Sequence, residues 1–174
     1  KSFLVRKSEF ENIPQTNFAK IPGSPIAYWA SEKSVGIFQN SPTLNDYGDL
    51  SKGLSTGEND RFIRAWYEIQ FDRIQFELEP GCINALPWVP CKKGGGGKKW
   101  FGYNEWVIDW RSNGQPLKDF KPRSVIRSPQ NYFKSIWTWS KISSNGISFR
   151  FNSNGFVPID AVSYLCPKDD SLWL

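Results

Sequence analysis

The chain has 174 residues, of which 39% are hydrophobic and 22% charged, and its formal net charge is +5. This length suits one domain, with at most a small appendage, and the composition is ordinary for a globular protein. The chain contains no histidine. That absence excludes Ser–His and Cys–His catalysis within the chain and removes the commonest metal ligand.

Cysteine content and hydropathy narrow the class of protein further. Cys82, Cys91 and Cys166 form no C-x-x-C pair, which disfavours a disulfide framework and a zinc site and suits a reducing cytoplasm. The mean hydropathy is −0.50, and no apolar run approaches the roughly 20 residues of a membrane helix. Residues 1–11 are charged and offer no signal peptide. Because the chain starts at Lys1 and contains no Met, we expect it to be a segment of a longer protein.

Basic charge is concentrated in one third of the chain. Residues 91–150 hold 12 of the 22 Lys and Arg but three of the 17 Asp and Glu, so this stretch carries +9. It also holds five of the nine tryptophans. Basic charge interleaved with flat rings predicts a surface that binds a polyanion, most often a nucleic acid. The alternative is a solvated basic face over a Trp-rich core.

The first third of the chain predicts little regular structure. Residues 1–19 are mixed and charged, and we expect a connector there, followed by a single domain over residues 20–174. Two prolines and a glycine break regular structure at residues 21–25, after which residues 26–30 favour a short helix or the start of one. Turn-forming residues make residues 39–60 rich in loops.

Residues 61–71 are the best candidate for a buried element. Their alternation and their β-branched and aromatic content favour a strand. A helix with Phe62, Trp66 and Ile69 on one face is the rival, since periodicity alone does not settle short runs. Residues 106–110 predict a second strand.

Three further strands are expected near the end of the chain. Residues 136–142 and 147–151 predict two strands joined by a turn at residues 143–146. Residues 156–159 can close the same sheet. The expected fold class is α+β, a twisted, mostly antiparallel sheet with flanking short helices and long loops. We expect most of the tryptophans on these strands to be in the core. They are Trp106, Trp110, Trp137 and Trp139.

A run of glycines at residues 94–97 lies between Lys92, Lys93, Lys98 and Lys99. Glycines let a backbone approach a phosphate closely, and lysines supply positive charge. No G-K-[ST] follows, so the run is not a P-loop. The alternative is a mobile surface loop, because glycine runs are typical of linkers.

Two more polar clusters are candidate contacts. Residues 53–57 (GLSTG) precede Asn59, Arg61 and Arg64, and such a loop can present hydroxyls, an amide and guanidinium groups to bases or phosphates. The alternative is a tight turn in which Asn59 caps its own backbone. The third cluster spans residues 124–144, where Arg, Asn and Gln are of the types that read bases in the major groove. Its members are Ser124, Arg127, Ser128, Gln130, Asn131, Ser140, Lys141, Ser143 and Ser144.

Six motifs then occur in a characteristic order. They are residues 21–29 (IPGSPIAYW), 53–64 (GLSTGENDRFIR), 88–102 (WVP, KGG and KKWFG), 107–114 (VIDW and NG), 137–143 (WTWS and IS) and 149–156 (FR and GF). In this order they strongly resemble the target-recognition region of PglX-type adenine-specific DNA methyltransferases of BREX (bacteriophage exclusion) defence systems. They are also similar to the corresponding region of single-chain type II restriction–modification enzymes, where a T-G-x-N-x-x-F element recurs. The resemblance spans about residues 20–157.

The resemblance implies DNA reading without the chemistry. In that family a separate methylase domain carries a glycine-rich S-adenosylmethionine motif and an N-P-P-Y/F motif for the flipped adenine, and neither occurs here. It therefore implies no cofactor and no catalytic residue in this chain, with S-adenosylmethionine bound in the parent methylase domain. The implied partners are double-stranded DNA and the methylase domain of the same polypeptide, in the bacterial cytoplasm and with no membrane.

Roles follow for the candidate residues. We expect Thr56 and Asn59 to shape or read their loop, and Arg61 and Arg64 to contact phosphates or guanine. The four lysines beside the glycine run would hold the DNA backbone. The remaining expected contacts line the same basic face and are Arg123, Arg127, Ser140, Lys141 and Arg150.

Two other classes of protein remain open. One is a protein-interaction module of the same defence system, whose basic face docks an acidic partner. The other is a carbohydrate-binding module, suggested by the many aromatic residues. It predicts exposed planar rings and little salt dependence, and the +9 stretch argues against it.

Overall fold

A computed structural model describes residues 14–144 and 146–169, and the chain divides into two compact units, residues 1–43 and 44–174. The expected boundary after residue 19 therefore falls inside the first unit, and the assignment of residues 20–174 to one domain stays a prediction. We describe each unit by itself.

The first unit contains a short 3-10 helix, η2 (Gln15–Lys20), and one α-helix, α1 (Glu32–Asn40). The Ser31 side chain caps α1 by accepting a hydrogen bond of 3.1 Å from Ser34 N. The expected helix at residues 26–30 is wrong. That stretch forms a turn, in which the amide of Ala30 donates to Ala27 O at 3.0 Å, and the helix begins only after the serine cap.

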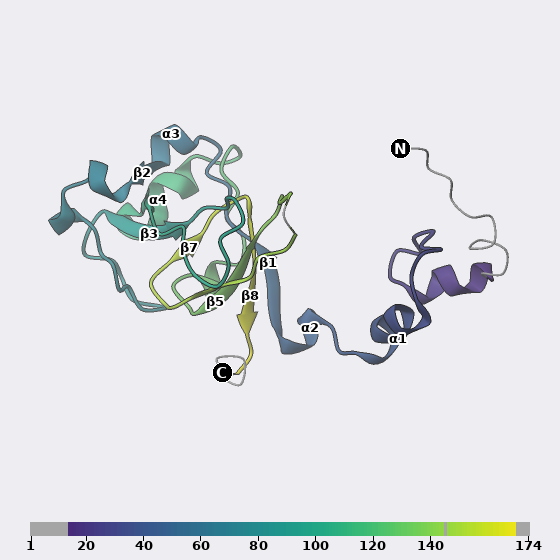
Figure 1. The fold of residues 1–174 in the computed structure, drawn as a ribbon. Helices are drawn as coiled ribbons and strands as arrows, with labels where there is room; N and C mark the ends of the chain where they lie inside the picture. Colours follow the sequence, from purple (N-terminus) through teal and green to yellow (C-terminus); the bar gives the residue numbers. More distant parts are fainter. Residues whose placement is uncertain (1–13, 145, 170–174) are drawn as a thin grey trace. The chain divides into compact units, whose positions relative to one another are not determined.

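The second unit is built on two four-stranded sheets (Figure 1). In the first sheet all neighbours are antiparallel, in the order β1 (Gly48–Lys52), β8 (Val162–Pro167), β5 (Ile136–Ser140) and β6 (Arg150–Asn152). The second sheet has the order β2 (Ile63–Ala65), β4 (Trp106–Asp109), β3 (Trp88–Lys92) and β7 (Val157–Pro158). Within the second sheet β3 and β7 pair in parallel, and the other neighbouring strands pair antiparallel. The α+β, mostly antiparallel prediction is confirmed, although it placed the strands in one sheet.

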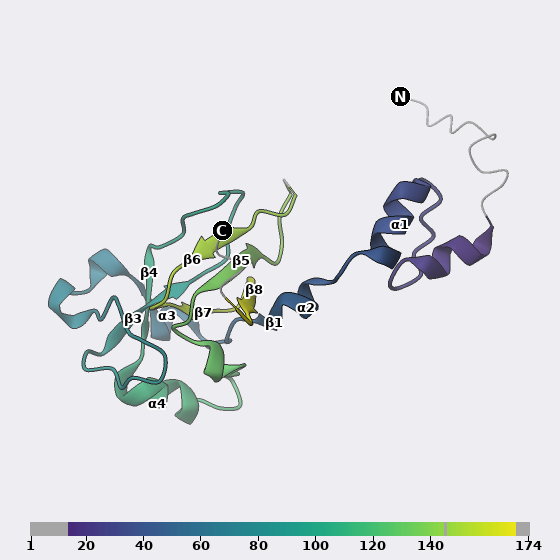
Figure 2. The ribbon, with the colours of Figure 1, turned by 90° about the horizontal axis from the view of Figure 1, so that it is seen from below.

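Short helices connect these strands. They are α2 (Leu44–Tyr47), α3 (Asn59–Phe62), η3 (Trp66–Glu68), η4 (Phe71–Arg73), α4 (Arg111–Asp119) and η5 (Pro129–Asn131). Leu117 of α4 packs with Val89 and Ile108 in the hydrophobic core, so α4 lies beside the second sheet (Figure 2).

The strands match the sequence-based expectations unevenly. Residues 106–109 and 136–140 are strands as predicted. Residues 61–71 are strand only at residues 63–65, because α3 and η3 flank that stretch. Residues 147–151 are strand only from Arg150.

Two further expectations concern the end of the chain and its tryptophans. Residues 157–158 join the second sheet rather than closing the sheet of β5. The turn at residues 143–146 lies partly outside the described residues. Trp110 is buried against Tyr132 and Phe133, with 5.7 Å between ring centres in each pair, whereas Trp106, Trp137 and Trp139 are only half-buried.

Residues 158–162 join the two sheets and are held by three other segments. The amides of Gly53 and Leu54 donate to Val162 O and Pro158 O, at 3.0 Å each. Ile159 N donates to Lys92 O at the end of β3, and Lys141 N donates to Ala161 O at the end of β5. A side chain at Gly53 would place its Cβ 2.2 Å from Ile159 O, so the crossing requires glycine there.

This crossing generates a stability prediction. We expect Gly53→Ala to lower the free energy of unfolding by about 1–3 kcal/mol, because its Cβ would meet backbone that cannot move aside. On the opposite strand of the crossing, Ala161 is exposed and has φ +76°. Ala161→Gly should be neutral or stabilise by up to about 1 kcal/mol, since it relieves left-handed backbone strain. Urea denaturation of both variants checks the opposite signs, and equal destabilisation would contradict this account.

Candidate nucleic-acid interface

The three polar clusters of the sequence meet at one pocket of about 440 Å³ in the second unit. Asn59, the first residue of α3, comes from the G-L-S-T-G cluster, and Ser140 and Lys141 come from the end of β5. The glycine run contributes Gly94 and Gly95. The other residues that line the pocket are Ile142, Asp160 and Ala161.

The start of the glycine run is fixed to β5 by a pair of hydrogen bonds. Gly95 N donates to Ser140 Oγ at 3.2 Å, and Ser140 Oγ donates to Gly95 O at 2.6 Å. A Cβ on Gly94 would lie 2.2 Å from Ala161 O. Gly94 and Gly95 are therefore bonded and closely packed within the protein, which their missing side chains allow.

Arg150 is bonded to the end of this loop, at Lys98, by a buried side chain. Its side chain is buried, and its Nη2 donates to Ser140 Oγ at 3.0 Å while its Nη1 donates to Lys98 O at 3.1 Å. Burial lowers the pKa of the guanidinium, which nevertheless remains charged at any ordinary pH. We expected Arg150 to contact DNA, but its burial does not support a direct contact.

The ring of Tyr103 supports the same loop, and sequence reasoning missed it. Cβ atoms on Gly95 and Gly96 would lie 3.2 Å and 2.6 Å from this side chain. The Arg150 guanidinium lies 5.1 Å from the ring centre, and Lys98 N donates to Tyr103 Oη at 3.4 Å. The one sequence feature that could have indicated this role of Tyr103 is the run of consecutive glycines shortly before it.

Lys92 and Thr56, two other expected contacts, are also buried. Lys92 Nζ donates to Asn104 Oδ1 and lies 4.0 Å from the centre of the Phe156 ring. Burial lowers the pKa of Lys92 from 10.5 to about 8. Thr56 Oγ1 donates to Asn59 Oδ1 at 2.6 Å. Both side chains therefore support the candidate interface from the interior and are not part of its accessible surface.

Four lysines remain accessible around the pocket and the glycine run. Lys93 is half-buried, with its Nζ 4.2 Å from the Trp106 ring centre. Lys98, Lys99 and Lys141 are exposed. Lys98 pairs with Glu105 at 3.7 Å, but both side chains are half-exposed, and such an ion pair contributes little stability.

Of the four other expected arginines, Arg61 and Arg123 have exposed side chains, and Arg64 and Arg127 donate to backbone carbonyls. Arg123 also pairs with Glu58 at 4.0 Å. Arg61 and Arg123 are exposed, and their guanidinium carbons lie 4.6 Å and 5.2 Å from the Phe120 ring centre. Arg64 Nη1 donates to Ile63 O at 2.7 Å, and Arg127 Nη1 donates to Gly53 O at 3.0 Å. Arg61 lines a different pocket from Asn59, together with Arg111 and Phe120, so the structure does not bring Arg61 into the pocket of Asn59 and Lys141.

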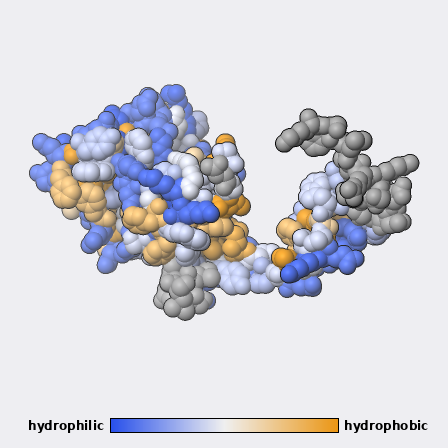
Figure 3. Space-filling model, viewed as in Figure 1, coloured by the Kyte–Doolittle hydropathy of each residue, from blue (hydrophilic) through white to orange (hydrophobic). Residues whose placement is uncertain are grey.

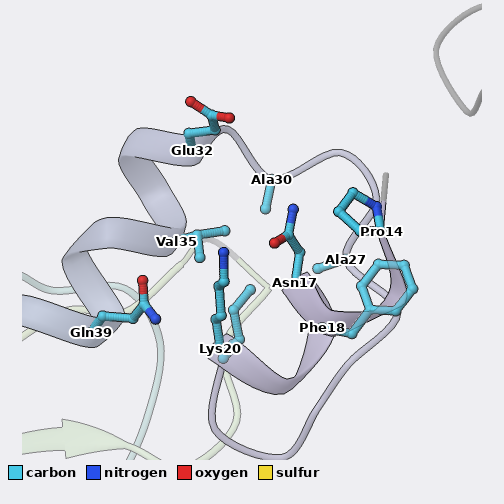
Figure 4. A pocket seen from close by; sticks show the side chains of 10 residues that line it. Pro14, Asn17, Phe18, Lys20, Ala27, Ala30, Glu32, Val35 and Gln39 are labelled. Atoms are coloured by element: carbon cyan, nitrogen blue, oxygen red, sulfur yellow. The ribbon is translucent and has the colours of Figure 1, made fainter. Parts of the chain in front are cut away.

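Elsewhere the surface offers less chemistry. Hydrophilic residues cover much of the face drawn in Figure 3, with separate hydrophobic areas among them. The first unit holds a pocket of about 540 Å³ whose lining includes Asn17, Lys20 and Glu32 (Figure 4). Among residues 14–144 and 146–169 no three His, Cys, Asp or Glu side chains gather to hold a metal ion. Within the same ranges no helix has the length and apolarity to cross a membrane.

Comparison with known proteins identifies two relatives, while no protein-family model matches the chain. The chain is 41% identical over 152 residues to the adenine-specific methyltransferase PglX of Lacticaseibacillus casei (strain Zhang), covering 82% of this chain and 13% of PglX. It is 36% identical over 173 residues to the adenine-specific methyltransferase BrxX of Escherichia coli O9:H4 (strain HS), covering 98% of this chain and 14% of BrxX. The resemblance to these methyltransferases is confirmed, and the chain corresponds to a small part of their length.

The buried ammonium of Lys92 predicts a pH-dependent stability. Because its pKa falls from 10.5 to about 8 on folding, the folded protein binds fewer protons than the unfolded chain between these values. The contribution of Lys92 to the free energy of unfolding therefore rises with pH across this window. We expect the stability of the wild type relative to Lys92→Met to rise by up to about 3 kcal/mol from pH 8 to pH 10.5.

Urea denaturation of both proteins across this pH range measures the difference. Subtracting the variant cancels titrations of groups that do not interact with Lys92. The pKa of the Cys91 thiol is raised by burial and lowered in part by Lys92, so both proteins should also carry Cys91→Ala. A difference that does not change with pH would contradict the burial of a charged Lys92.

Proposed function

We propose that this chain is the target-recognition domain of a BREX-type adenine-N6 DNA methyltransferase, and that its second unit holds duplex DNA for a methylase domain elsewhere in the polypeptide. The homology to PglX and BrxX supports the parent activity. The observation that carries DNA recognition is the meeting of Asn59, the glycine run, Ser140 and Lys141 at one pocket, with accessible lysines around it.

The accessible side chains then take two roles. Lys93, Lys98, Lys99 and Lys141 contact phosphates, because an ammonium on a flexible stem is a point charge without base geometry. Asn59 and the exposed Arg61 and Arg123 are of the types that read adenine and guanine edges. Thr56, Arg64, Lys92, Arg127, Ser140 and Arg150 hold these groups in place through the internal contacts described above.

The parent enzyme would bind S-adenosylmethionine in its methylase domain. This chain contains no Asn-Pro pair and so lacks the N-P-P-Y/F motif that holds a flipped adenine. We therefore assign it positioning and specificity, and no step of methyl transfer. Titration of duplex DNA into the full-length enzyme and into a form lacking this chain tests the proposal. Equal affinity and equal sequence preference in the two forms would sink it.

Salt dependence distinguishes the phosphate contacts. Replacing both Lys98 and Lys99 by Ala in the full-length enzyme should weaken binding to all sequences alike. It should reduce the magnitude of the log–log salt slope by about 1.8, at roughly 0.9 per phosphate contact. The matched control is Lys52→Ala, since Lys52 is exposed on β1 at the opposite edge of the first sheet from β6. A slope that falls equally in the control would show that these lysines hold no particular phosphates.

Sequence preference distinguishes the base contacts. We expect Asn59→Ala in the full-length enzyme to cost about 1–3 kcal/mol on the cognate site and to relax the methylated motif at one position, because a bidentate amide contact to adenine is lost. Sequencing of methylated sites in cells measures the motif. Asn154→Ala is the control, since Asn154 is exposed in the same unit but lies outside this pocket. If Arg61→Ala relaxes the motif and Asn59→Ala does not, the guanidinium rather than the amide is the reader.

A further inference from the structure

Two adjacent aromatic side chains project from the end of the glycine run. Trp100 is 69% exposed and Phe101 is 68% exposed, although both are large apolar residues. They directly follow Lys98 and Lys99, which are also exposed. An exposed apolar group with charges at its edge is typical of a surface that binds another molecule.

The backbone of Trp100 is fixed, although its side chain is exposed. Trp100 N donates to Phe149 O at 2.9 Å, and Phe151 N donates to Trp100 O at 3.0 Å, which forms a bridge to Arg150 of β6. Two residues earlier, Lys98 O accepts from the buried guanidinium of Arg150. The indole is therefore carried by a segment that is tied to the first sheet.

The same residue has a strained backbone. Trp100 has φ +69°, which is uncommon for a bulky side chain and favours glycine or asparagine. Strained residues persist where the surrounding hydrogen bonds enforce them, and they are concentrated at functional sites. Here the strain accompanies the exposure of an indole that gains nothing from burial within this unit.

Charge indicates what this indole contacts. Lys98 and Lys99 are its neighbours in the chain, and the buried ammonium of Lys92 lies 6.0 Å from the Phe101 ring centre. By contrast, the exposed ring of Tyr67 is followed in the chain by Glu68, whose charge repels phosphates. The Trp100 surface therefore suits a polyanion that also offers flat apolar faces, and the base pairs of DNA provide both.

We propose that Trp100 is a wedge that stacks on a base at an opened step of the DNA duplex, while Lys98 and Lys99 bind the flanking phosphates. This inference rests on the proposed function and adds a residue that acts on the shape of the duplex. Apolar side chains inserted at a base step unstack it and bend the helix, and stacking is tolerant of sequence because every base has a flat face. The wedge therefore contributes affinity and a local opening of the duplex, while the pocket contributes the choice of sequence.

The test uses the full-length methyltransferase and duplexes that carry a single 2-aminopurine, moved one position at a time across the methylation site. The wild type should raise 2-aminopurine fluorescence at the target adenine and, separately, at the step where Trp100 inserts. Trp100→Asn removes the ring and keeps a residue that tolerates the left-handed backbone. It should abolish the second signal, retain the first and weaken binding by roughly 5- to 100-fold, with an unchanged salt slope.

Two further variants complete the design. Trp100→Phe retains a flat ring and should preserve most of the second signal and of the affinity. Tyr67→Ala removes an exposed ring elsewhere in the same unit and should behave as the wild type. A wild type without a second signal, or a Trp100→Asn variant that retains it, would overturn the wedge. If the lysine variants and the tryptophan variants all bind DNA as tightly as the wild type, the proposed function is overturned as well.

Discussion

Residues 158–162 hold together the three parts of the chain that carry the candidate interface. Four of their backbone groups are bonded to the segments that lead into it: Pro158 O and Val162 O to residues 53–54, Ile159 N to Lys92 O, and Ala161 O to Lys141 N. Asp160 N adds a fifth bond, of 2.6 Å, to Leu54 O. Buried backbone groups are costly to leave unpaired, so a displacement of this short segment disturbs all three neighbours together. The pocket lined by Asn59, Gly94 and Lys141 exists because its walls share this support.

Two buried cations, Arg150 and Lys92, lie in segments next to the basic loop, whose Lys98 pairs with Glu105. Arg150 and Lys92 carry charge into the protein, and both are paired with oxygens and aromatic rings rather than with carboxylates. A buried charge with neutral partners is costly but contributes a positive potential that a salt bridge would cancel. The loop above them therefore presents Lys98 and Lys99 over a basic interior. Some of the positive charges of residues 91–150 therefore lie inside the protein and hold the loop, and the others are at the surface.

Composition and periodicity predicted the parts of the fold that depend on local sequence. The strands at residues 106–109 and 136–140 are bounded by turn formers and have apolar faces, so a local pattern is sufficient to find them. Pairing between distant segments is not encoded in such patterns. For this reason β7 was assigned to the wrong sheet, and residues 61–71 were predicted as one strand although their ends form helical turns.

The sequence predicted which residue types form the candidate site, but not which of their side chains are exposed. The glycine run, Asn59, Ser140 and Lys141 were selected from separate parts of the sequence and do line one pocket. Lys92 and Lys93 are adjacent and chemically identical, yet one is buried beside Phe156 and the other lies half-exposed over Trp106. Lys92 is the last residue of β3, which is buried from Val89 onwards, and Lys93 lies beyond the end of the strand. Where the strand ends becomes known only once its pairing with β4 and β7 is fixed.

Rigidity has a consequence for recognition. A flexible lysine loop would bind phosphates in many geometries and would lose that freedom on binding, which lowers affinity without adding selectivity. The bonds from Ser140 and Arg150 restrict the backbone of this loop at Gly95 and Lys98, which would reduce that cost in the proposed complex with DNA. The lysine stems retain their own mobility and can follow a backbone of any sequence, whereas Asn59 and Trp100 are carried on fixed backbone. Under the proposed function, affinity and selectivity would therefore change independently, because the two would depend on different side chains supported by the same crossing.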